Sequence, residues 1–338
     1  MFKILSLEQK EQWNMIIRSM NRYDFYHLAE YHQLEHSGQA LLLYFSSKET
    51  SLSLPVILRP IAGTKYNDLT SVYGYAGPLS DRENPDEQAV KDFHKELLHF
   101  FDLHAIVSVF ARLHPLFNDQ EFLLSGLGKI VNTNPTVGID CSLSELEQKE
   151  QYAHSLKNHI NWLKRKNVVV KKEQTKDAID LFIEIYRENM KRVNASKMYF
   201  FSDDYFYRFM KELPASLYLA YYEGKAIGGS LSVSCSGIVQ LHLSATRNDY
   251  LQWSPLKLIW DCIRKDAIEK NEKWMHLGGG VGGVDDTLFQ FKAQFSNLRF
   301  LFKTWRYIYN EEVYARLVFE KYANDIPDSS FFPLYRLD

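Results

Sequence analysis

The chain has 338 residues, of which 46% are apolar and 24% are charged, and its formal net charge is −2. These values are typical of a globular protein with room for two domains, and they exclude a disordered or collagen-like chain. A near-neutral charge argues against nucleic-acid binding over the whole surface. No apolar run approaches the about 20 residues that cross a bilayer, and the N-terminus becomes polar too early for a signal peptide. We therefore expect a soluble, cytoplasmic protein.

Cysteine usage points to a reducing compartment. Cys141, Cys235 and Cys262 are far apart and lack C-x-x-C spacing, so neither a disulfide framework nor a zinc or other metal site is expected. The 21 tyrosines and 22 phenylalanines indicate either aromatic-lined grooves or aromatic-rich packing around strands.

The first half of the chain predicts a mixed α/β domain over residues 1–145. Apolar spacing and turn residues mark the elements. In chain order they are a helix at 7–20, a short helix at 25–36, strands at 40–46 and 52–60, an ordered loop at 63–81, a helix at 87–101, and strands at 105–112 and 136–141.

The second half predicts a similar domain over residues 146–338. In chain order its elements are a helix at 146–166, a strand at 168–172, helices at 176–192 and 203–213, antiparallel strands at 217–222, 226–234 and 238–246, a helix at 254–270, strands at 273–277 and 300–309, and a helix at 311–322. Ser254 is the expected N-cap of its helix, with Pro255 at the first helical position. Both halves run helix, helix, antiparallel strands, helix, strand, which indicates a duplicated unit. The expected fold is α/β (α+β), two domains with largely antiparallel mixed sheets flanked by helices.

A glycine-dense segment, HLGGGVGGVDD, begins at His276. Gly278, Gly280 and Gly283 satisfy the dinucleotide-binding spacing G-x-G-x-x-G, yet only a short amphipathic stretch follows, and no acid lies between Asp286 and Glu311. A Rossmann site needs a long helix and an acid about 20 residues on. The segment instead predicts a close-approach turn between a strand and a helix that Asp285 or Asp286 caps.

Several phrases in order resemble one enzyme family. They are YGYAGPL, FARLHP, SLKNHINWLKRKN, YRENMKRVNASKMYFFS, QLHLSATRNDY followed by SPLKLIWD, and HLGGGVGGVDDTLFQFKAQF. Together they resemble the FemABX-like branch of the GNAT acyltransferase superfamily, which consists of tandem GNAT domains related to peptidoglycan aminoacyltransferases. The resemblance covers almost the whole chain. It implies an acyltransferase whose acceptor is a peptidoglycan stem peptide or an amino sugar.

The sequence departs from standard GNAT enzymes where they bind coenzyme A. Those enzymes hold the pyrophosphate with a Q/R-x-x-G-x-G/A turn at a helix N-terminus, whereas this chain reads RNDYLQWSP with no glycine. The long helical arm of the larger Fem proteins is also missing. Asn161 and Trp162 follow Ile160 where the family tends to place basic residues.

Four residues are the candidates for catalysis. Lys292, in an aromatic setting, suits a phosphate or the oxyanion of an acyl-transfer intermediate, although a lysine reaching out of an amphipathic helix is the alternative. In the Fem family the matching F-K pair lies near the reacting centre, which also implicates Phe291. His242 and His276 titrate in a range suited to accept the proton of the attacking amine, and buried structural histidines are the alternative. Asp286 competes for that role with helix capping.

The candidate substrate-binding residues form three groups. Gly278, Gly279 and Gly280 offer backbone amides or close passage for substrate, against simple turn formation. An aromatic loop with flanking bases is a candidate site for a diphosphate-linked sugar, and structural arginines are the alternative. These residues are Tyr73, Tyr75, Arg59, Arg112 and His114, with Arg192, Tyr199 and Arg247 carrying similar weight in the second domain.

A basic cluster surrounds the helix at 146–166 and the following strand. Its members are Lys157, Lys164, Arg165, Lys166, Lys171 and Lys172. Contact with tRNA phosphates is one interpretation, and a solvated helix face is the favoured one.

The sequence thus predicts transfer of an acyl or aminoacyl group to an amine held between two domains. No cofactor is expected to bind tightly, and the co-substrate donor is aminoacyl-tRNA or acyl-CoA. An acyl-CoA-dependent N-acetyltransferase and a non-catalytic ligand- or RNA-binding protein remain alternatives. The oligomeric state is left open.

Overall fold

The computed structural model describes residues 1–280 and 286–337. The chain divides into two compact units, the first made of residues 1–133 and 301–338 and the second of residues 134–300. The sequence-based ranges 1–145 and 146–338 differ from these units mainly at the C-terminus, because the segment from residue 301 onward belongs with the first unit.

The first unit is built on a mixed sheet. Strands β1 to β4 pair antiparallel in order, β4 pairs parallel with β6, and β6 pairs antiparallel with β13. The strands are β1 (Phe2–Ser6), β2 (Gln39–Ser46), β3 (Ser51–Pro60), β4 (Asn67–Thr70), β5 (Leu79–Ser80), β6 (Ile106–Arg112) and β13 (Arg299–Ile308).

Helices cover this sheet and close its core. α3 turns Phe93, Leu97 and Phe101 toward the strands, where they join a core that includes Trp305 of β13. Asp86 caps α3 by accepting a hydrogen bond from Ala89 N–H at 2.7 Å. The helices of the unit are α1 (Lys10–Arg18), α2 (Ala29–His32), α3 (Glu87–Leu103), α4 (Gln120–Leu123) and α11 (Glu311–Tyr322), with single 3₁₀ turns at Leu7–Gln9, Phe25–His27 and Leu334–Arg336.

A buried carboxylate fastens the C-terminal segment to the first unit. Asp68 of β4 is fully buried, and its Oδ2 accepts hydrogen bonds from Tyr335 Oη at 3.0 Å and Arg336 Nε at 2.9 Å. Its Oδ1 accepts from Arg59 Nε at 2.8 Å. Arg59, a candidate phosphate ligand from the sequence, is therefore engaged in this network.

The second unit repeats the pairing order of the first. Strands β8 to β11 pair antiparallel in sequence, β11 pairs parallel with β12, and β12 pairs antiparallel with β7. The strands are β7 (Lys129–Asp140), β8 (Val169–Glu173), β9 (Ala215–Tyr222), β10 (Lys225–Cys235), β11 (Ile238–Thr246) and β12 (Trp274–Gly278). The shared order supports the predicted duplication and confirms the predicted fold class.

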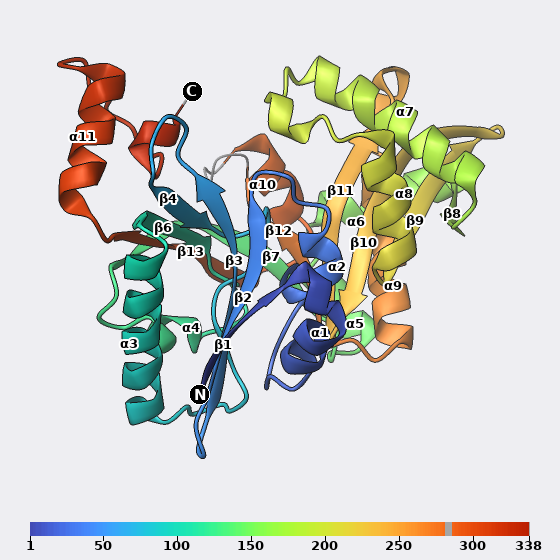
Figure 1. Ribbon diagram of the computed structural model, residues 1–338. Coiled ribbons are helices and arrows are strands. Elements are labelled where there is room, and N and C mark those ends of the chain that lie inside the picture. Colours follow the sequence, from blue (N-terminus) through green and yellow to red (C-terminus); the bar gives the residue numbers. More distant parts are fainter. Residues whose placement is uncertain (281–285, 338) are drawn as a thin grey trace. The chain divides into compact units, whose positions relative to one another are not determined.

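Helices lie on both faces of the second sheet (Figure 1). Neighbouring glycines on β10 admit them, because a Cβ on Gly228 would lie 2.9 Å from Pro255 at the start of α9, and one on Gly229 would lie 2.7 Å from Phe182 of α7. Adjacent strand residues face opposite ways, so the pair lets a helix approach on each side. The helices are α5 (Glu145–Glu150), α6 (His154–Arg165), α7 (Lys176–Arg192), α8 (Asp203–Glu212), α9 (Leu256–Glu269) and α10 (Thr287–Ala293), with 3₁₀ turns at Lys197–Tyr199 and Asn248–Trp253.

Three local expectations were wrong, and one strand was missed. The expected loop at 63–81 contains β4 and β5, and the N-terminal strand β1 was missed. The expected helix at 146–166 is two helices, because Tyr152 turns inward to Asp261 and Ala153 N–H donates to Gln294 O. Ser254 does not cap α9: its backbone is left-handed at φ 43°, and its hydroxyl donates to Leu251 O.

Candidate active site

The site that the second unit offers begins where β11 and β12 separate. Their parallel pairing covers only Ile238–Gln240 and Trp274–His276. β11 then continues to Thr246 along β10, whereas β12 ends at Gly278 beside Val137 of β7. Within the described residues, β11 after Gln240 and β12 after His276 no longer pair with each other. Such backbone groups are suited to bind a ligand, because main-chain donors and acceptors need partners.

A β-bulge shapes the β11 side of the split. Leu231 lies opposite Leu243 and Ser232 lies opposite Leu241, so His242 is the extra residue. Bulges of this kind re-aim a residue and are frequent beside active sites.

The His242 ring contacts α8. Its Nε2 lies 2.7 Å from Tyr205 Oη, and the ring stacks on Phe209 with centroids 4.5 Å apart. Burial lowers the pKa of His242 to about 3, so the ring is neutral at pH 7. A neutral imidazole bonded to a phenol can pass a proton, but it is a weak base. Tyr205, which the sequence analysis did not single out, thus belongs to the candidate site.

The β12 side of the split carries Lys292. Asp286 caps α10 by accepting from Phe289 N–H at 2.8 Å, and one helical turn further on Lys292 Nζ donates to Gly279 O at 2.7 Å. Burial lowers the pKa of Lys292 to about 8, and the Asp286 carboxylate opposes that shift. The side chain is still mainly an ammonium at neutral pH, and it is less shielded by water than a surface lysine. A desolvated cation of this kind stabilises negative charge that develops nearby.

Glycines at the end of β12 lead to the carbonyl that the ammonium binds. Gly278 has φ +76°, a conformation that favours glycine, and a Cβ on Gly279 would come within 3.3 Å of Pro135 O. Gly280 is the last described residue before the gap. The sequence candidates Gly283 and Asp285 lie outside the described residues.

Aromatic side chains of α9 and α10 pack against each other. The rings of Phe291 and Trp260 are 5.1 Å apart, and Lys257 Nζ lies 5.8 Å from the centre of the Phe291 ring. Burial lowers the pKa of Lys257 below its usual value. Trp260 and Lys257 lie on the first turns of α9, and the sequence analysis passed over both. Their position just after the predicted helix start was the signal that could have identified them.

His276 occupies a different environment from Lys292. The ring is fully buried, with Nδ1 2.8 Å from Gln240 Oε1 and Nε2 2.8 Å from Thr136 Oγ1. Both ring nitrogens therefore have partners on neighbouring strands of the sheet. This arrangement matches the buried structural histidine that was the alternative interpretation.

The predicted ligands of the first unit form a firmly packed loop. Gln120 Nε2 donates to Ala76 O and Pro78 O, and Gln120 Oε1 accepts from His114 N–H. His114 Nε2 lies 3.0 Å from the buried Asp24 Oδ2, and burial lowers the pKa of the ring to about 3.

The aromatic and basic members of that loop are also in contact with neighbours. The Tyr75 ring packs edge-on to Tyr26 and Phe302, Arg112 lies over the Phe110 ring, and the Tyr73 carbonyl accepts from Tyr31 Oη. These contacts hold the loop against its neighbours. Its role in substrate binding stays a prediction.

Two glutamates of α7 contact the connection from β11 to α9, where coenzyme A enzymes bind pyrophosphate. Arg247 Nη1 donates to Glu184 Oε1 at 2.8 Å and lies 3.5 Å from Glu188 Oε2, and its Nε donates to Ala226 O. Glu188 Oε1 also accepts from Asn248 N–H at 2.6 Å. The Glu188 carboxylate therefore already accepts the hydrogen bond of a backbone amide, that of Asn248, which a phosphate would need. Arg247, proposed from the sequence as a substrate ligand, ties β11 to α7.

The two remaining candidates lie near the C-terminal end of α7. Arg192 Nη2 donates to Asn189 Oδ1, and the Tyr199 carbonyl accepts from Tyr186 Oη at 2.9 Å.

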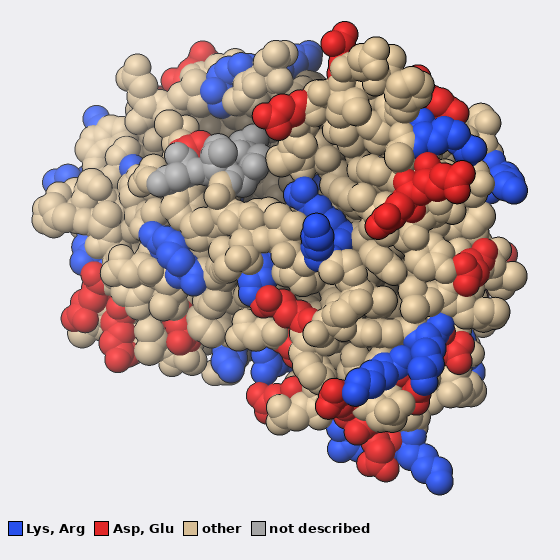
Figure 2. Space-filling model, turned by 90° about the vertical axis from the view of Figure 1, so that its left-hand side faces the viewer, with Lys and Arg blue, Asp and Glu red and all other residues tan. Residues whose placement is uncertain are grey.

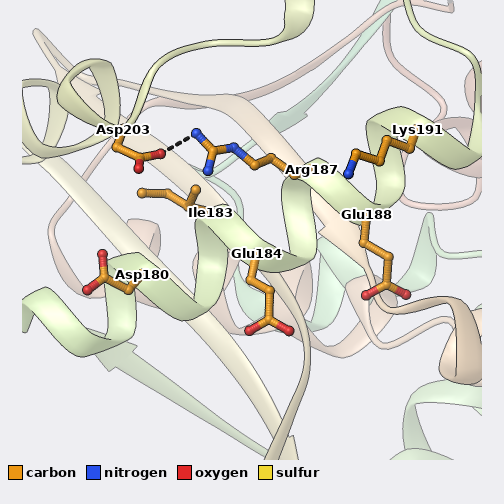
Figure 3. Close-up of a pocket in the computed structure, with 7 residues that line it drawn as sticks. All are labelled: Asp180, Ile183, Glu184, Arg187, Glu188, Lys191 and Asp203. Atoms are coloured by element: carbon orange, nitrogen blue, oxygen red, sulfur yellow. Dashed lines mark hydrogen bonds and ion pairs between the residues drawn. The ribbon is translucent and has the colours of Figure 1, made fainter.

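An open pocket of about 540 Å³ lies on the solvent side of α7. Figure 3 shows its lining, and Arg187 bridges to Asp203 across it. Its other carboxylates are also engaged: Glu184 and Glu188 with Arg247, and Asp180 with Tyr207. The seven lining residues are Asp180, Ile183, Glu184, Arg187, Glu188, Lys191 and Asp203. None of the sequence candidates lines it, so we place the chemistry at the strand split instead.

Comparison with known proteins identifies the second unit. Residues 151–292 match the family model described as "Acetyltransferase (GNAT) domain". The chain contains a GNAT acyltransferase domain. The matched range begins just before α6 and ends at Lys292. It includes β11 and β12, and therefore the place where these two strands separate.

Solved structures extend the similarity over the whole chain. "Crystal structure of FemX" has a TM-score of 0.72 at 11% identity and covers 93% of this chain and 99% of that one. L-PGS from Bacillus licheniformis has a TM-score of 0.60 at 13% identity, covering 89% and 92%. A conserved protein of unknown function from Bacteroides thetaiotaomicron has a TM-score of 0.59 at 11% identity, covering 90% and 98%. At these identities the likeness concerns the fold, which is consistent with the FemABX-like branch. No curated protein matched the sequence.

Among the described residues, no helix combines the length and apolarity needed to cross a membrane. Within the same part of the chain, no three His, Cys, Asp or Glu side chains are grouped to hold a metal ion.

Proposed function

We propose that this acyltransferase moves an acyl or aminoacyl group from an activated ester to an amine of a cell-envelope precursor. The acceptor is a peptidoglycan stem peptide or an amino sugar of a surface polysaccharide. The GNAT domain, the fold shared with FemX and the FemABX-like phrases of the sequence support this proposal.

The observation that carries the proposal is the pairing of a strand split with a desolvated ammonium. Lys292 holds its charge beside the end of β12, where a carbonyl entering the split would develop negative charge as the amine attacks. In that step a C–N bond forms, the ester C–O bond breaks, and the proton lost by the amine passes to the leaving oxygen, which departs as an alcohol. Positioning and charge stabilisation are the main contributions we assign to the protein.

A covalent enzyme intermediate has little chemical support. Burial raises the pKa of Cys141 to about 12 and that of Cys262 to about 11, so these thiols are not thiolates at neutral pH. We therefore propose direct attack of the acceptor amine on the donor ester.

The β11–α9 connection favours a donor other than coenzyme A. At the place where a coenzyme A enzyme binds pyrophosphate, Arg247 is paired with Glu184 and Glu188, and Asn248 N–H donates to Glu188. Aminoacyl-tRNA is the donor we propose, in line with the FemABX resemblance.

A second candidate is an acyl-CoA-dependent N-acetyltransferase acting on a sugar or a small amine. The match to the acetyltransferase domain model favours it, because that fold generally uses acyl-CoA. A non-catalytic ligand- or RNA-binding protein is the alternative of another class, and it predicts no turnover with any donor.

Ligand-dependent melting and a transfer assay test the proposal together. We expect a UDP-linked muropeptide or UDP-amino sugar to raise the melting temperature, since a ligand that binds only the native state stabilises it. With aminoacyl-tRNA, mass spectrometry of the acceptor should show the added aminoacyl mass. If acetyl-CoA alone stabilised the protein and its acetyl group were transferred, the proposal that aminoacyl-tRNA is the donor would be wrong. Absence of transfer from both donors would overturn the catalytic proposal.

A further inference from the structure

A short segment of the second unit combines exposed apolar side chains with positively charged ones. We call residues 189–202, between α7 and α8, the apolar-basic loop. Val193, Met198 and Phe200 are 48%, 56% and 44% exposed. Lys191, Arg192 and Lys197 are exposed as well, and the loop contains no Asp or Glu.

Hydrogen bonds give the loop a defined conformation, in which these side chains are exposed. Tyr199 N–H donates to Ser196 O and Phe200 N–H donates to Lys197 O, which forms the 3₁₀ turn that carries Met198. Tyr186 Oη fastens the turn to α7 through Tyr199 O. Phe201 turns inward and stacks on Tyr205, with ring centroids 4.2 Å apart. The adjacent Phe200 remains outside.

The charge of the loop contrasts with that of other parts of the surface. On the face drawn in Figure 2, Lys and Arg are interspersed with Asp and Glu, in keeping with the net charge of −2. Exposed apolar side chains that occur singly need no explanation. Here three lie within eight residues, in a segment whose own charged residues are all cations, although Glu188 and Asp203 flank it. This combination favours a partner that is apolar and anionic at once.

We propose that the apolar-basic loop docks on the surface of a bilayer that contains anionic lipid. Apolar side chains enter the boundary between headgroups and acyl chains, while lysine and arginine stay at the charged headgroups. RNA is the other anionic polymer to consider. It is less suited, because Val193 and Met198 cannot stack on bases and aliphatic side chains gain nothing from a phosphate backbone. The inference rests on exposure and charge and does not depend on the proposed function.

Sedimentation with sucrose-loaded vesicles tests this docking on the full chain. Vesicles contain equal parts of phosphatidylglycerol and phosphatidylcholine, or phosphatidylcholine alone, and neither donor nor acceptor is present. We expect binding to the anionic vesicles that weakens with added salt. M198S/F200S should lower the partition coefficient about tenfold or more. K191Q/K197Q should lower it about 25-fold, because each of the two cations near the surface contributes roughly a fivefold factor.

A matched control separates the loop from general surface apolarity. M15S/F319S replaces two side chains that are 65% and 60% exposed on α1 and α11, so it removes similar apolar area elsewhere. It should bind like the parent chain, and unchanged melting temperatures would show that all variants fold. Equal binding by M198S/F200S and the parent, or no binding to anionic vesicles, would overturn the proposal. Binding to bulk tRNA in place of the vesicles would assign the loop to nucleic acid.

Discussion

Burial determines what Lys292 can do chemically. A lysine in water has a pKa near 10.4, but desolvation lowers the pKa of Lys292 to about 8 while a 2.7 Å hydrogen bond holds the ammonium against Gly279 O. The group is therefore cationic below pH 8 and loses its charge just above the physiological range.

Lys292→Met is the sharpest test at the residue scale. We expect kcat to fall about 100-fold, as when one preorganised donor is removed from an oxyanion site. Because the charged form is needed, kcat/KM of the parent enzyme should decline as the pH rises through about 8. Lys257→Met is the matched control, since burial also lowers the pKa of that lysine but it lies over Phe291. It should change KM more than kcat. Unaltered turnover in the Lys292 variant would remove this residue from the mechanism.

At the scale of elements, the end of β12 depends on a left-handed glycine. Gly278 (φ +76°) immediately precedes Gly279, whose carbonyl Lys292 binds. Gly63 (φ +74°) has the same backbone conformation in an exposed turn of the first unit, with no neighbour near its Cβ direction. Comparing the same substitution at Gly278 and at Gly63 therefore separates the cost of backbone strain from an effect on the candidate site.

Gly278→Ala and Gly63→Ala should each destabilise the chain by about 1–2 kcal/mol, because a Cβ is disfavoured in the left-handed region. Only Gly278→Ala should also reduce turnover. Urea denaturation and steady-state kinetics on both variants measure the two effects. Equal kinetics in the two variants would show that the backbone conformation at Gly278 does not matter for activity.

The link between β4 and the C-terminal segment depends on Asp68. Asp68→Asn keeps the shape but removes the charge that Arg59, Tyr335 and Arg336 bind. We expect a loss of about 3 kcal/mol, since an arginine left without its buried partner is costly. Limited proteolysis should then remove residues near the C-terminus first. Exposed Asp325, changed to Asn, is the control and should leave the digestion pattern unchanged.

At the scale of the whole molecule, buried neutral histidines set the response to acid. Burial lowers the pKa of His27, His114 and His242 to about 3 and that of His32 to about 4. In the unfolded chain these side chains bind protons near pH 6.5. Between about pH 6.5 and 4 the unfolded state therefore holds more protons, and stability must fall as the pH is lowered.

We expect the free energy of unfolding to drop by about 1.4 kcal/mol per pH unit for each such histidine in that interval. Urea titrations at pH 7, 6 and 5 measure the slope. His32→Gln, which removes one of the four, should flatten it by about one quarter. A slope that is zero between pH 6.5 and 5 would contradict the burial of these rings.

Local signals made much of the fold predictable. The bounds of α7 and α11 agree with the sequence-based ranges 176–192 and 311–322, and Asp286 caps α10 as one of the two predicted aspartates. These features depend on capping and apolar spacing within a few residues. Where a distant partner decided the conformation, the prediction was wrong, as at Tyr152, whose contact with Asp261 ends one helix and starts another.

The sequence by itself determined most of the elements, the duplicated order and the capped start of α10, because each follows from interactions between residues close in the chain. Only the tertiary structure decided which strand joins which sheet, where β11 parts from β12, and how far Lys292 is desolvated. Strand pairing and burial depend on residues far apart in the sequence, as when β13 pairs with β6 and Asp68 binds the C-terminal segment. Single-sequence patterns do not contain that information.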